Sequence, residues 1–539
     1  MAAAAPAAAG RSDQVELSAY VRARAADSLG ATDKAVQHYA AALASSPGNQ
    51  IVAASALRQA LAAGDRALAV KAARTLDSPG GVNPEVRFVL LGEAVRTGQW
   101  QDAQRQADAV GKDEVFSFMA PLIRAWIAVG SKQGDPLALL SAGAADPLAG
   151  SYIAEHRPLI LLALGREREG LIELRNRVEA RDTRAQRLLV AGAAYLAREG
   201  KRAQALTLLD GDGARLAAAR AWLAKHDRLS GEIATPAQGL AEYFLRVALD
   251  LQRQDVQPLA LSFARLSTFL APDQSESWLV TSALLAAQNQ NREALSVLRN
   301  VAPTDPAAAL VSDIRIDLLT TAGDQTEALK EAQKAVTAKS ATVSDWTRLG
   351  DLYARLERND EAADAYSKAL LQNPRETNPR PEWTLWLLLG GAREQAGQWR
   401  DAKAALETAY KLAPNEPLVL NYLGYAQLER RENVGEAEKL IAEASRLQPD
   451  SAQITDSLGW AHYLRGDVKT AIELLERAVQ GEPTDPAINE HLGDAYYSAG
   501  RRYEARYAWS AALITAEARD APRIRAKIAT GLTADLASP

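Results

Sequence analysis

A single period of 34 residues constrains this chain more than any other feature. Within residues 343–376, apolar or small side chains fall at positions 4, 7, 8 and 11, and again at positions 20, 24 and 27, with proline at position 32. Each set marks one face of a helix, so the unit predicts two helices joined by a short turn. The residues at these positions are Trp346, Leu349, Gly350, Tyr353, Ala362, Tyr366, Ala369 and Pro374.

The same period runs through most of the chain. Units at 241–274, 275–308, 309–342 and 343–376 abut; after an insertion at 377–382, units follow at 383–416, 417–451, 452–485 and 486–519. Three weaker units occupy 16–49, 50–83 and 84–117, with alanine at position 20 of each. This fixed phase predicts a repeat array.

The remaining segments complete the expected domain organisation. Residues 1–15 are rich in Ala and Pro and predict a flexible tether, whereas 118–240 predict degenerate helical repeats whose turn-rich end, 229–239, joins two halves. The array of eight repeats then spans 241–519, and 520–539 predict a helix and tail that cap it.

The filled positions of residues 343–375 resemble the tetratricopeptide repeat (TPR). The resemblance implies an all-α fold, a right-handed α-solenoid of about 11–13 stacked helix pairs in two halves.

Composition and motifs argue against several kinds of chemistry. The chain of 539 residues has a net charge of −5, no cysteine and five histidines without metal-ligand spacing. Nucleotide-binding loops and hydrolase or zinc-protease motifs are absent from the sequence. We therefore expect no enzyme activity, no cofactor, no metal and no nucleic-acid partner. No apolar run is long enough to predict a transmembrane segment.

The expected functional surface is the concave wall formed by the first helices. Positions 2, 5, 9 and 12 of the last three units would face this groove and place aromatic side chains beside carboxylates, an arrangement suited to a basic or neutral peptide. The alternative is that these side chains pack against neighbouring first helices within the wall. The candidate partner-binding residues are Asn421, Tyr425, Asp456, Trp460, Tyr463, Glu490, Asp494 and Tyr497.

Three longer motifs refine the resemblance: NYLGYAQLER (421–430), DSLGWAHYLRGD (456–467) and NEHLGDAYYSAGRRYEARYAWSAAL (489–513). Residues 241–535 resemble proteobacterial TPR lipoproteins of the cell envelope, some of which bring a C-terminal-processing protease to its substrates. The resemblance implies a periplasmic, outer-membrane-associated protein with a lipid anchor in its precursor. The anchoring cysteine is missing and the start, MAAAAPAAAG, is no intact signal peptide. A cytoplasmic location is therefore the alternative.

Together these observations predict a non-enzymatic adaptor or scaffold whose groove holds protein or peptide partners, among them an envelope protease or an outer-membrane complex. The alternative is a structural subunit of a larger envelope assembly complex.

Overall fold

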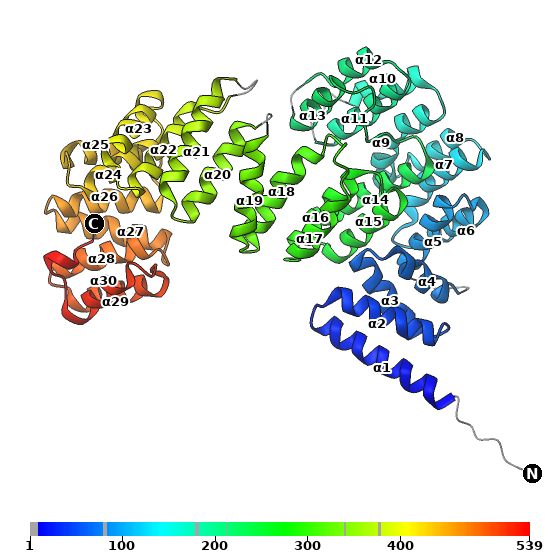
Figure 1. Ribbon diagram of the computed structural model, residues 1–539, viewed down its shortest axis with the longest axis horizontal. Helices are drawn as coiled ribbons and strands as arrows, with labels where there is room; N and C mark the ends of the chain where they lie inside the picture. Colours follow the sequence, from blue (N-terminus) through cyan, green and yellow to red (C-terminus); the bar gives the residue numbers. More distant parts are fainter. Residues whose placement is uncertain are drawn as a thin grey trace, which may run out of the picture. The chain divides into compact units, whose positions relative to one another are not determined.

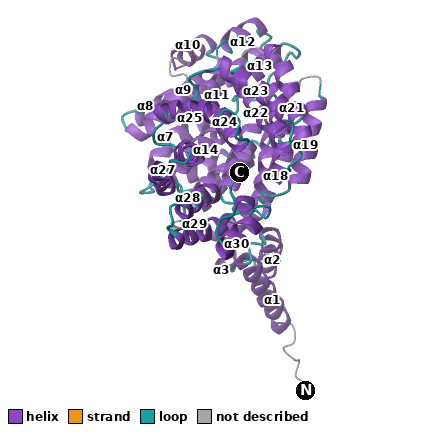
Figure 2. Cartoon of the chain, turned by 90° about the vertical axis from the view of Figure 1, so that its left-hand side faces the viewer, coloured by secondary structure: helices purple, strands orange, loops and turns teal. Residues whose placement is uncertain are grey.

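The computed structural model describes residues 9–78, 83–177, 183–211, 213–338, 341–375 and 379–538. Every regular element in these ranges is a helix (Figure 2), which confirms the all-α prediction. The chain divides into two compact units, Met1–Asp324 (unit 1) and Gln325–Pro539 (unit 2). None of the described helices is both long and apolar enough to cross a bilayer.

The helices of unit 1 are α1 (Ala9–Ser28), α2 (Thr32–Ser45), α3 (Gln50–Ala63), α4 (Arg66–Leu76), α5 (Pro84–Arg96), α6 (Trp100–Val110), α7 (Ala120–Ser131), α8 (Pro136–Gly143), α9 (Pro147–Ala163), α10 (Glu167–Arg177), α11 (Thr183–Arg198), α12 (Arg202–Leu208), α13 (Ala214–Leu223), α14 (Pro236–Arg253), α15 (Gln257–Leu270), α16 (Ser275–Ala287), α17 (Asn291–Val297) and α18 (Ala308–Thr321). Those of unit 2 are α19 (Gln325–Thr337), α20 (Val343–Arg355), α21 (Asn359–Gln372), α22 (Glu382–Gln395), α23 (Trp399–Leu412), α24 (Pro417–Glu429), α25 (Val434–Leu447), α26 (Ala452–Leu464), α27 (Val468–Gly481), α28 (Pro486–Ser498), α29 (Arg502–Thr515) and α30 (Ala521–Thr530).

Consecutive helices pack as pairs because small residues stand where their axes approach. A Cβ atom on Gly350 would lie 2.5 Å from the Tyr366 ring, so position 8 of this repeat has no room for a larger side chain. Ala362, at position 20 of the same repeat, is fully buried. The paired helices in contact are α20 with α21, α22 with α23, α24 with α25, α26 with α27, and α28 with α29.

In unit 1 the chain folds back on itself. The pair α14 and α15 packs against α3, α5, α7 and α9, which lie earlier in the chain and are not its neighbours in sequence (Figure 1). The contact is aromatic, because the Phe88 ring centroid lies 5.5 Å from that of Phe244 and 5.1 Å from that of Phe263. At its edges the Ser262 hydroxyl donates to Glu85 at 2.8 Å and Arg265 Nη2 donates to the Ala62 carbonyl at 3.0 Å.

Because of this packing, the boundary between the two halves lies later in the chain than the sequence predicts. The turn-rich segment 229–239 was expected to be the joint, but the compact units divide between Asp324 and Gln325. The physical reason is that α14 and α15, which follow this segment, bury their apolar faces against α3, α5, α7 and α9. The predicted tether also differs, since α1 already begins at Ala9; residues 1–8 lie outside the described residues.

The insertion between the units 343–376 and 383–416 is held by one side chain. Asn373 Nδ2 donates to the Arg380 carbonyl at 2.9 Å, and its Oδ1 accepts from the Arg380 amide at 2.8 Å. The part of the insertion that the structure describes therefore follows a defined path into α22.

Candidate functional site

The first helices α22, α24, α26 and α28 of unit 2 enclose a pocket of about 300 Å³, here called the α24 pocket. Its lining residues are Glu394, Gln395, Asn421, Tyr422, Tyr425, Ala426, Glu429, Gln453, Asp456, Ser457, Asp485, Ala487 and Ile488. These residues come from four successive repeats, so the pocket exists only because the helix pairs stack.

The α24 pocket carries an excess of negative charge. Four of its lining residues are carboxylates, and no lysine, arginine or histidine is among the lining residues that the structure describes. Arg430, just outside, donates to Glu394 at 2.6 Å and lies 3.6 Å from Glu429. Burial raises the pKa of Glu429, and the nearby Glu394 raises it further. The pocket therefore holds carboxylates that its own cation only partly offsets.

Tyrosine and asparagine side chains add specific contacts. Burial raises the pKa of Tyr422 and of Tyr425, so both phenols stay neutral at physiological pH. Gly391 lets the Tyr422 hydroxyl come close, because a Cβ at that position would lie 2.8 Å from it. Asn421 Oδ1 is buried and accepts no hydrogen bond from the described residues. This oxygen is an acceptor available to a donor placed in the pocket.

Three of the predicted partner-binding residues, Asn421, Tyr425 and Asp456, line the α24 pocket. The Asp456 carboxylate is 6 % exposed and faces His491, whose Nδ1 lies 3.0 Å from Oδ1. Burial alone would lower the pKa of His491, but Asp456, with Asp494 and Glu490 behind it, raises that pKa above its ordinary value. His491 is thereby favoured as the cation in this pair.

Trp460 and Tyr463 are not in an open groove. Trp460 has no exposed surface, and its ring is stacked between His491 at 4.2 Å and Tyr463 at 4.7 Å. The Tyr463 hydroxyl is hydrogen-bonded to Ser498 on the next first helix at 2.9 Å. The expected aromatic stripe is therefore largely packing between neighbouring first helices, which is the alternative considered from the sequence. The reason is that adjacent first helices approach closely enough for these rings to bridge them.

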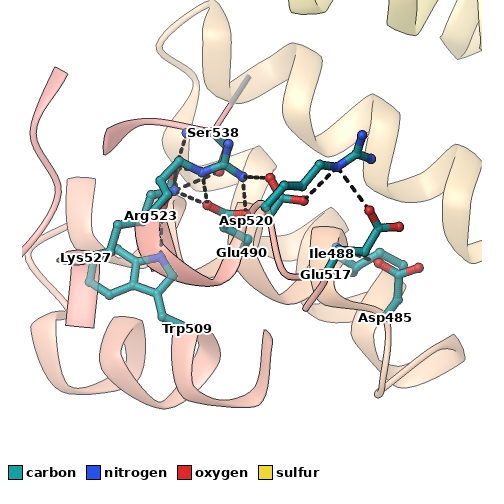
Figure 3. Close-up of polar contacts among 11 residues, drawn as sticks. Asp485, Ile488, Glu490, Trp509, Glu517, Asp520, Arg523, Lys527 and Ser538 are labelled. Atoms are coloured by element: carbon teal, nitrogen blue, oxygen red, sulfur yellow. Dashed lines mark hydrogen bonds and ion pairs between the residues drawn. The ribbon is translucent and has the colours of Figure 1, made fainter. Parts of the chain in front are cut away.

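Glu490 contacts Arg523 and Lys527 (Figure 3), and Asp494 also has partners within the chain. Arg523 Nε and Nη2 donate to the Glu490 carboxylate at 3.0 and 2.8 Å. The fully buried Lys527 ammonium donates to Glu490 at 2.7 Å and to Asp494 at 2.8 Å. Ser538 completes this arrangement, since its amide and hydroxyl donate to Asp494 at 2.9 and 2.8 Å. We call the contact of Arg523, Lys527 and Ser538 with these two carboxylates the C-terminal latch.

Tyr497 lies at the same end of unit 2 and is half-buried. Its ring centroid is 5.6 Å from that of Trp509, and a Cβ on Gly531 would meet its hydroxyl at 2.3 Å. The segment after α30 therefore covers Tyr497. Of the eight candidates, Glu490 and Asp494 therefore belong to the C-terminal latch, and Tyr497 lies beside it.

Sequence reasoning missed Glu394, Tyr422 and Glu429 of the pocket. Glu394 occupies position 12 of its unit, the wall position that Tyr463 and Tyr497 hold in theirs, so its place in the repeat is a signal that could have identified it. The partners of the C-terminal latch had a weaker signal: Arg523 and Lys527 are four residues apart on a predicted helix, which places both on one face. Among the described residues no cluster of three or more His, Cys, Asp or Glu is arranged to hold a metal ion.

Comparison with known proteins connects this geometry to a repeat family. Four overlapping segments, 347–398, 387–452, 428–486 and 457–522, match the family described as tetratricopeptide repeat. A TPR repeat-containing protein, PA4667, from Pseudomonas aeruginosa is 28 % identical over 179 residues, which is 33 % of this chain and 29 % of that protein. The human protein O-mannosyl-transferase TMTC1 is 22 % identical over 236 residues, 43 % of this chain and 21 % of that protein. The chain thus spans less than a third of the length of these relatives.

Solved structures that are similar to this chain superpose on it only in part. A TPR protein from Thermus thermophilus, TTC0263, is 24 % identical and covers 35 % of this chain and 98 % of its own, with a TM-score of 0.30. Yeast Tom70 is 13 % identical and covers 96 % of both chains, with a TM-score of 0.36. The helix pairs of residues 347–522, which match the family in both period and small-residue placement, are therefore tetratricopeptide repeats.

Proposed function

We propose that this protein is a non-enzymatic scaffold that binds a basic segment of a partner protein in the α24 pocket. The observation that carries the proposal is the lining of the pocket: four carboxylates, two tyrosines and no cationic side chain among the described lining residues. Arg430 and His491 offset only part of this charge, so a bound lysine or arginine would add to the counter-charge. The tyrosines would supply contact area at little cost in rotamer entropy.

The protein itself contains an example of such recognition. On α28, Glu490 accepts two hydrogen bonds from Arg523 of α30. Glu490 stands at position 5 of its repeat, as Asp456 and Asn421 do in theirs. In the α24 pocket Arg430 contacts Glu394 and Glu429, and His491 pairs with Asp456. Asp485 forms no ion pair among the described residues, so we infer that the partner supplies the remaining cation.

Binding should depend on pH in a defined direction. Burial and the nearby Glu394 raise the pKa of Glu429, so this carboxyl takes up a proton at a higher pH than an exposed glutamate does. Because a basic segment prefers the ionised form, affinity should rise as the pH rises through that pKa. Replacing Glu429 by Gln should weaken binding and flatten this dependence.

The cellular setting is part of the proposal. The motifs of residues 421–430, 456–467 and 489–513 resemble those of envelope TPR lipoproteins, and the relative PA4667 is bacterial. We infer a periplasmic protein associated with the outer membrane, whose partner is an envelope protease or an outer-membrane complex. Fractionation of cells that make the natural gene product tests this: recovery in the periplasm or with outer membranes supports it, and recovery in the cytosol contradicts it.

Selection of a random peptide library on the intact chain tests the α24 pocket. Enriched peptides should carry arginine or lysine, and their binding should weaken in a Tyr425→Ala, Glu429→Gln variant. A matched control is Glu473→Gln, because Glu473 is exposed on α27, away from the pocket. Enrichment without basic residues, or binding that both variants leave unchanged, would contradict the proposal.

A further inference from the structure

The outer face of α29 carries large apolar side chains that the fold does not bury. Tyr503 and Tyr507 are each 79 % exposed, and Ile514 is 83 % exposed. With 3.6 residues per turn, spacings of four and eleven residues put all three on one side of the helix. The opposite side of α29 holds Ala505, Trp509 and Ala512, all fully buried. Tyr503, Tyr507 and Ile514 are called the α29 stripe.

The repeat architecture does not require tyrosines at these places. Tyr503 and Tyr507 occupy positions 18 and 22 of their unit. The same two positions are exposed in earlier second helices, where they hold Asp360 and Asp364 in α21, Arg400 and Ala404 in α23, and Lys469 and Glu473 in α27. Only small or charged side chains stand there, as expected for a solvated helix face. The aromatic pair on α29 therefore needs an explanation other than repeat packing.

The charge beside the α29 stripe is positive. Arg502 and Arg506 are exposed on one edge of it, and neither forms an ion pair with a carboxylate among the described residues. Arg506 Nε donates to the Ile528 carbonyl at 3.2 Å, and the Arg502 guanidinium lies 5.6 Å from the centroid of the Tyr497 ring. On the other edge Glu504 accepts from Arg501 at 3.0 Å. In a chain of net charge −5 this is a local basic patch.

From this combination we propose that the α29 stripe is a second docking surface, which takes an acidic segment of a partner protein that also presents apolar side chains. Tyrosine and arginine are the residues enriched at the centres of protein interfaces. Charge complementarity selects an acidic occupant, and it disfavours pairing of the stripe with itself, because two copies would bring Arg502 and Arg506 against their equivalents. The proposal does not depend on the α24 pocket, which carries the opposite charge.

The test uses the full chain and two synthetic helical peptides, each with leucines along one face. In the first peptide glutamates flank the leucines. In the second peptide the leucines are kept and lysines replace the glutamates. We expect the glutamate peptide to bind saturably and to lose about tenfold or more in affinity when Tyr503→Ser and Tyr507→Ser are combined. A similar loss is expected for Arg502→Glu with Arg506→Glu, together with weaker binding at higher salt. All four positions are exposed, so these variants should fold.

The matched control changes the equivalent positions of α27, Lys469→Ser with Glu473→Ser, and should leave glutamate-peptide binding unchanged. Binding of the lysine peptide should respond to Tyr425→Ala in the α24 pocket and to none of the α29 variants, which separates the two proposals. Three results would overturn the inference: no saturable binding of the glutamate peptide, binding unaffected by the α29 variants, or cosedimentation with phosphatidylglycerol vesicles that requires Tyr503 and Tyr507. The last result would identify a membrane surface as the occupant.

Discussion

Units 1 and 2 use the same kind of first-helix wall in different ways. In unit 1 the wall of α3, α5, α7 and α9 is covered by the chain's own α14 and α15. In unit 2 the wall of α22, α24, α26 and α28 keeps a pocket of about 300 Å³, and α30 covers only its last helix. In both units the helix that covers the wall brings side chains complementary to it.

The chemistry of the two walls differs as their occupants do. Unit 1 presents Phe88 and Phe116, and the helices covering them bring Phe244 and Phe263, so four of the six phenylalanines of the chain meet there. Unit 2 presents carboxylates, and where its wall is covered the covering helix α30 brings Arg523 and Lys527. The apolar wall is thus covered by the chain's own helices, whereas the acidic wall keeps the pocket in which we propose that a partner binds.

The largest expected effect is in unit 1. Replacing Phe263 by Ala should lower its free energy of unfolding by about 3–5 kcal/mol, because a fully buried ring would leave a cavity between α15 and α5. Hydrogen exchange of the intact chain should show the loss in α3, α5, α14 and α15 while α24 and α26 keep their protection. Leu371→Ala, at an exposed site, is the control. A uniform loss across both units, or a change below about 1 kcal/mol, would refute the idea that α14 and α15 are integral to unit 1.

The C-terminal latch should give the next largest effect. Lys527→Met removes a buried cation and leaves Asp494 buried without its main counter-charge, which should cost about 3 kcal/mol. Faster amide exchange in α28, α29 and α30 is the readout, and Lys469→Met on exposed α27 is the control. Unchanged exchange in these helices would show that the latch contributes little to holding α30.

Trp460 and Tyr425 should separate stability from binding. Tyr425→Ala should weaken a bound basic peptide by about 2 kcal/mol and should destabilise the fold less than Trp460→Ala, because Tyr425 is only partly buried from solvent. Trp460→Ala should instead destabilise α26 and α28, because the Trp460 ring is fully buried against His491. Calorimetric titration and denaturant unfolding of both variants measure the two quantities. If Trp460→Ala instead weakened peptide binding and Tyr425→Ala destabilised the fold, Trp460 would belong to the binding surface and its assignment to the core would be wrong.

The smallest effect concerns pH. His491 has a raised pKa in the folded protein, so its pairing with Asp456 stabilises the fold fully below the ordinary histidine pKa of about 6.5. That stability is lost as the pH rises through the raised value. Denaturant midpoints measured across this range should therefore decline in the wild type, and Asp456→Asn should reduce the decline. If the denaturant midpoint declined equally in the wild type and in Asp456→Asn, the pair of His491 and Asp456 would not be the cause of the decline.

The sequence predicted local structure well because the repeat period is a local signal. α20 begins at Val343, α24 at Pro417 and α28 at Pro486, each the first residue of its expected unit. Small residues such as Gly350 and Ala362 mark helix crossings between neighbours in the chain, so their spacing is visible without coordinates.

The contacts that the period could not predict join distant parts of the chain. Nothing in the spacing of α14 and α15 indicates that they return to α3, and the position of Trp460 in a first helix does not say whether its ring faces solvent or His491. The pocket could be predicted in part: wall positions identified Asn421, Tyr425 and Asp456, while the charges that neutralise Glu490 and Asp494 came from a helix outside the repeats.

The hydrogen bond between Arg265 and the Ala62 carbonyl joins residues 203 positions apart. In an ordinary repeat array each repeat meets only its neighbours, so an added repeat breaks no contact between distant repeats. An additional repeat between α3 and α15 would carry these two ends apart and uncover the aromatic contact. We therefore expect unit 1 to tolerate substitutions more readily than the insertion of a further helix pair.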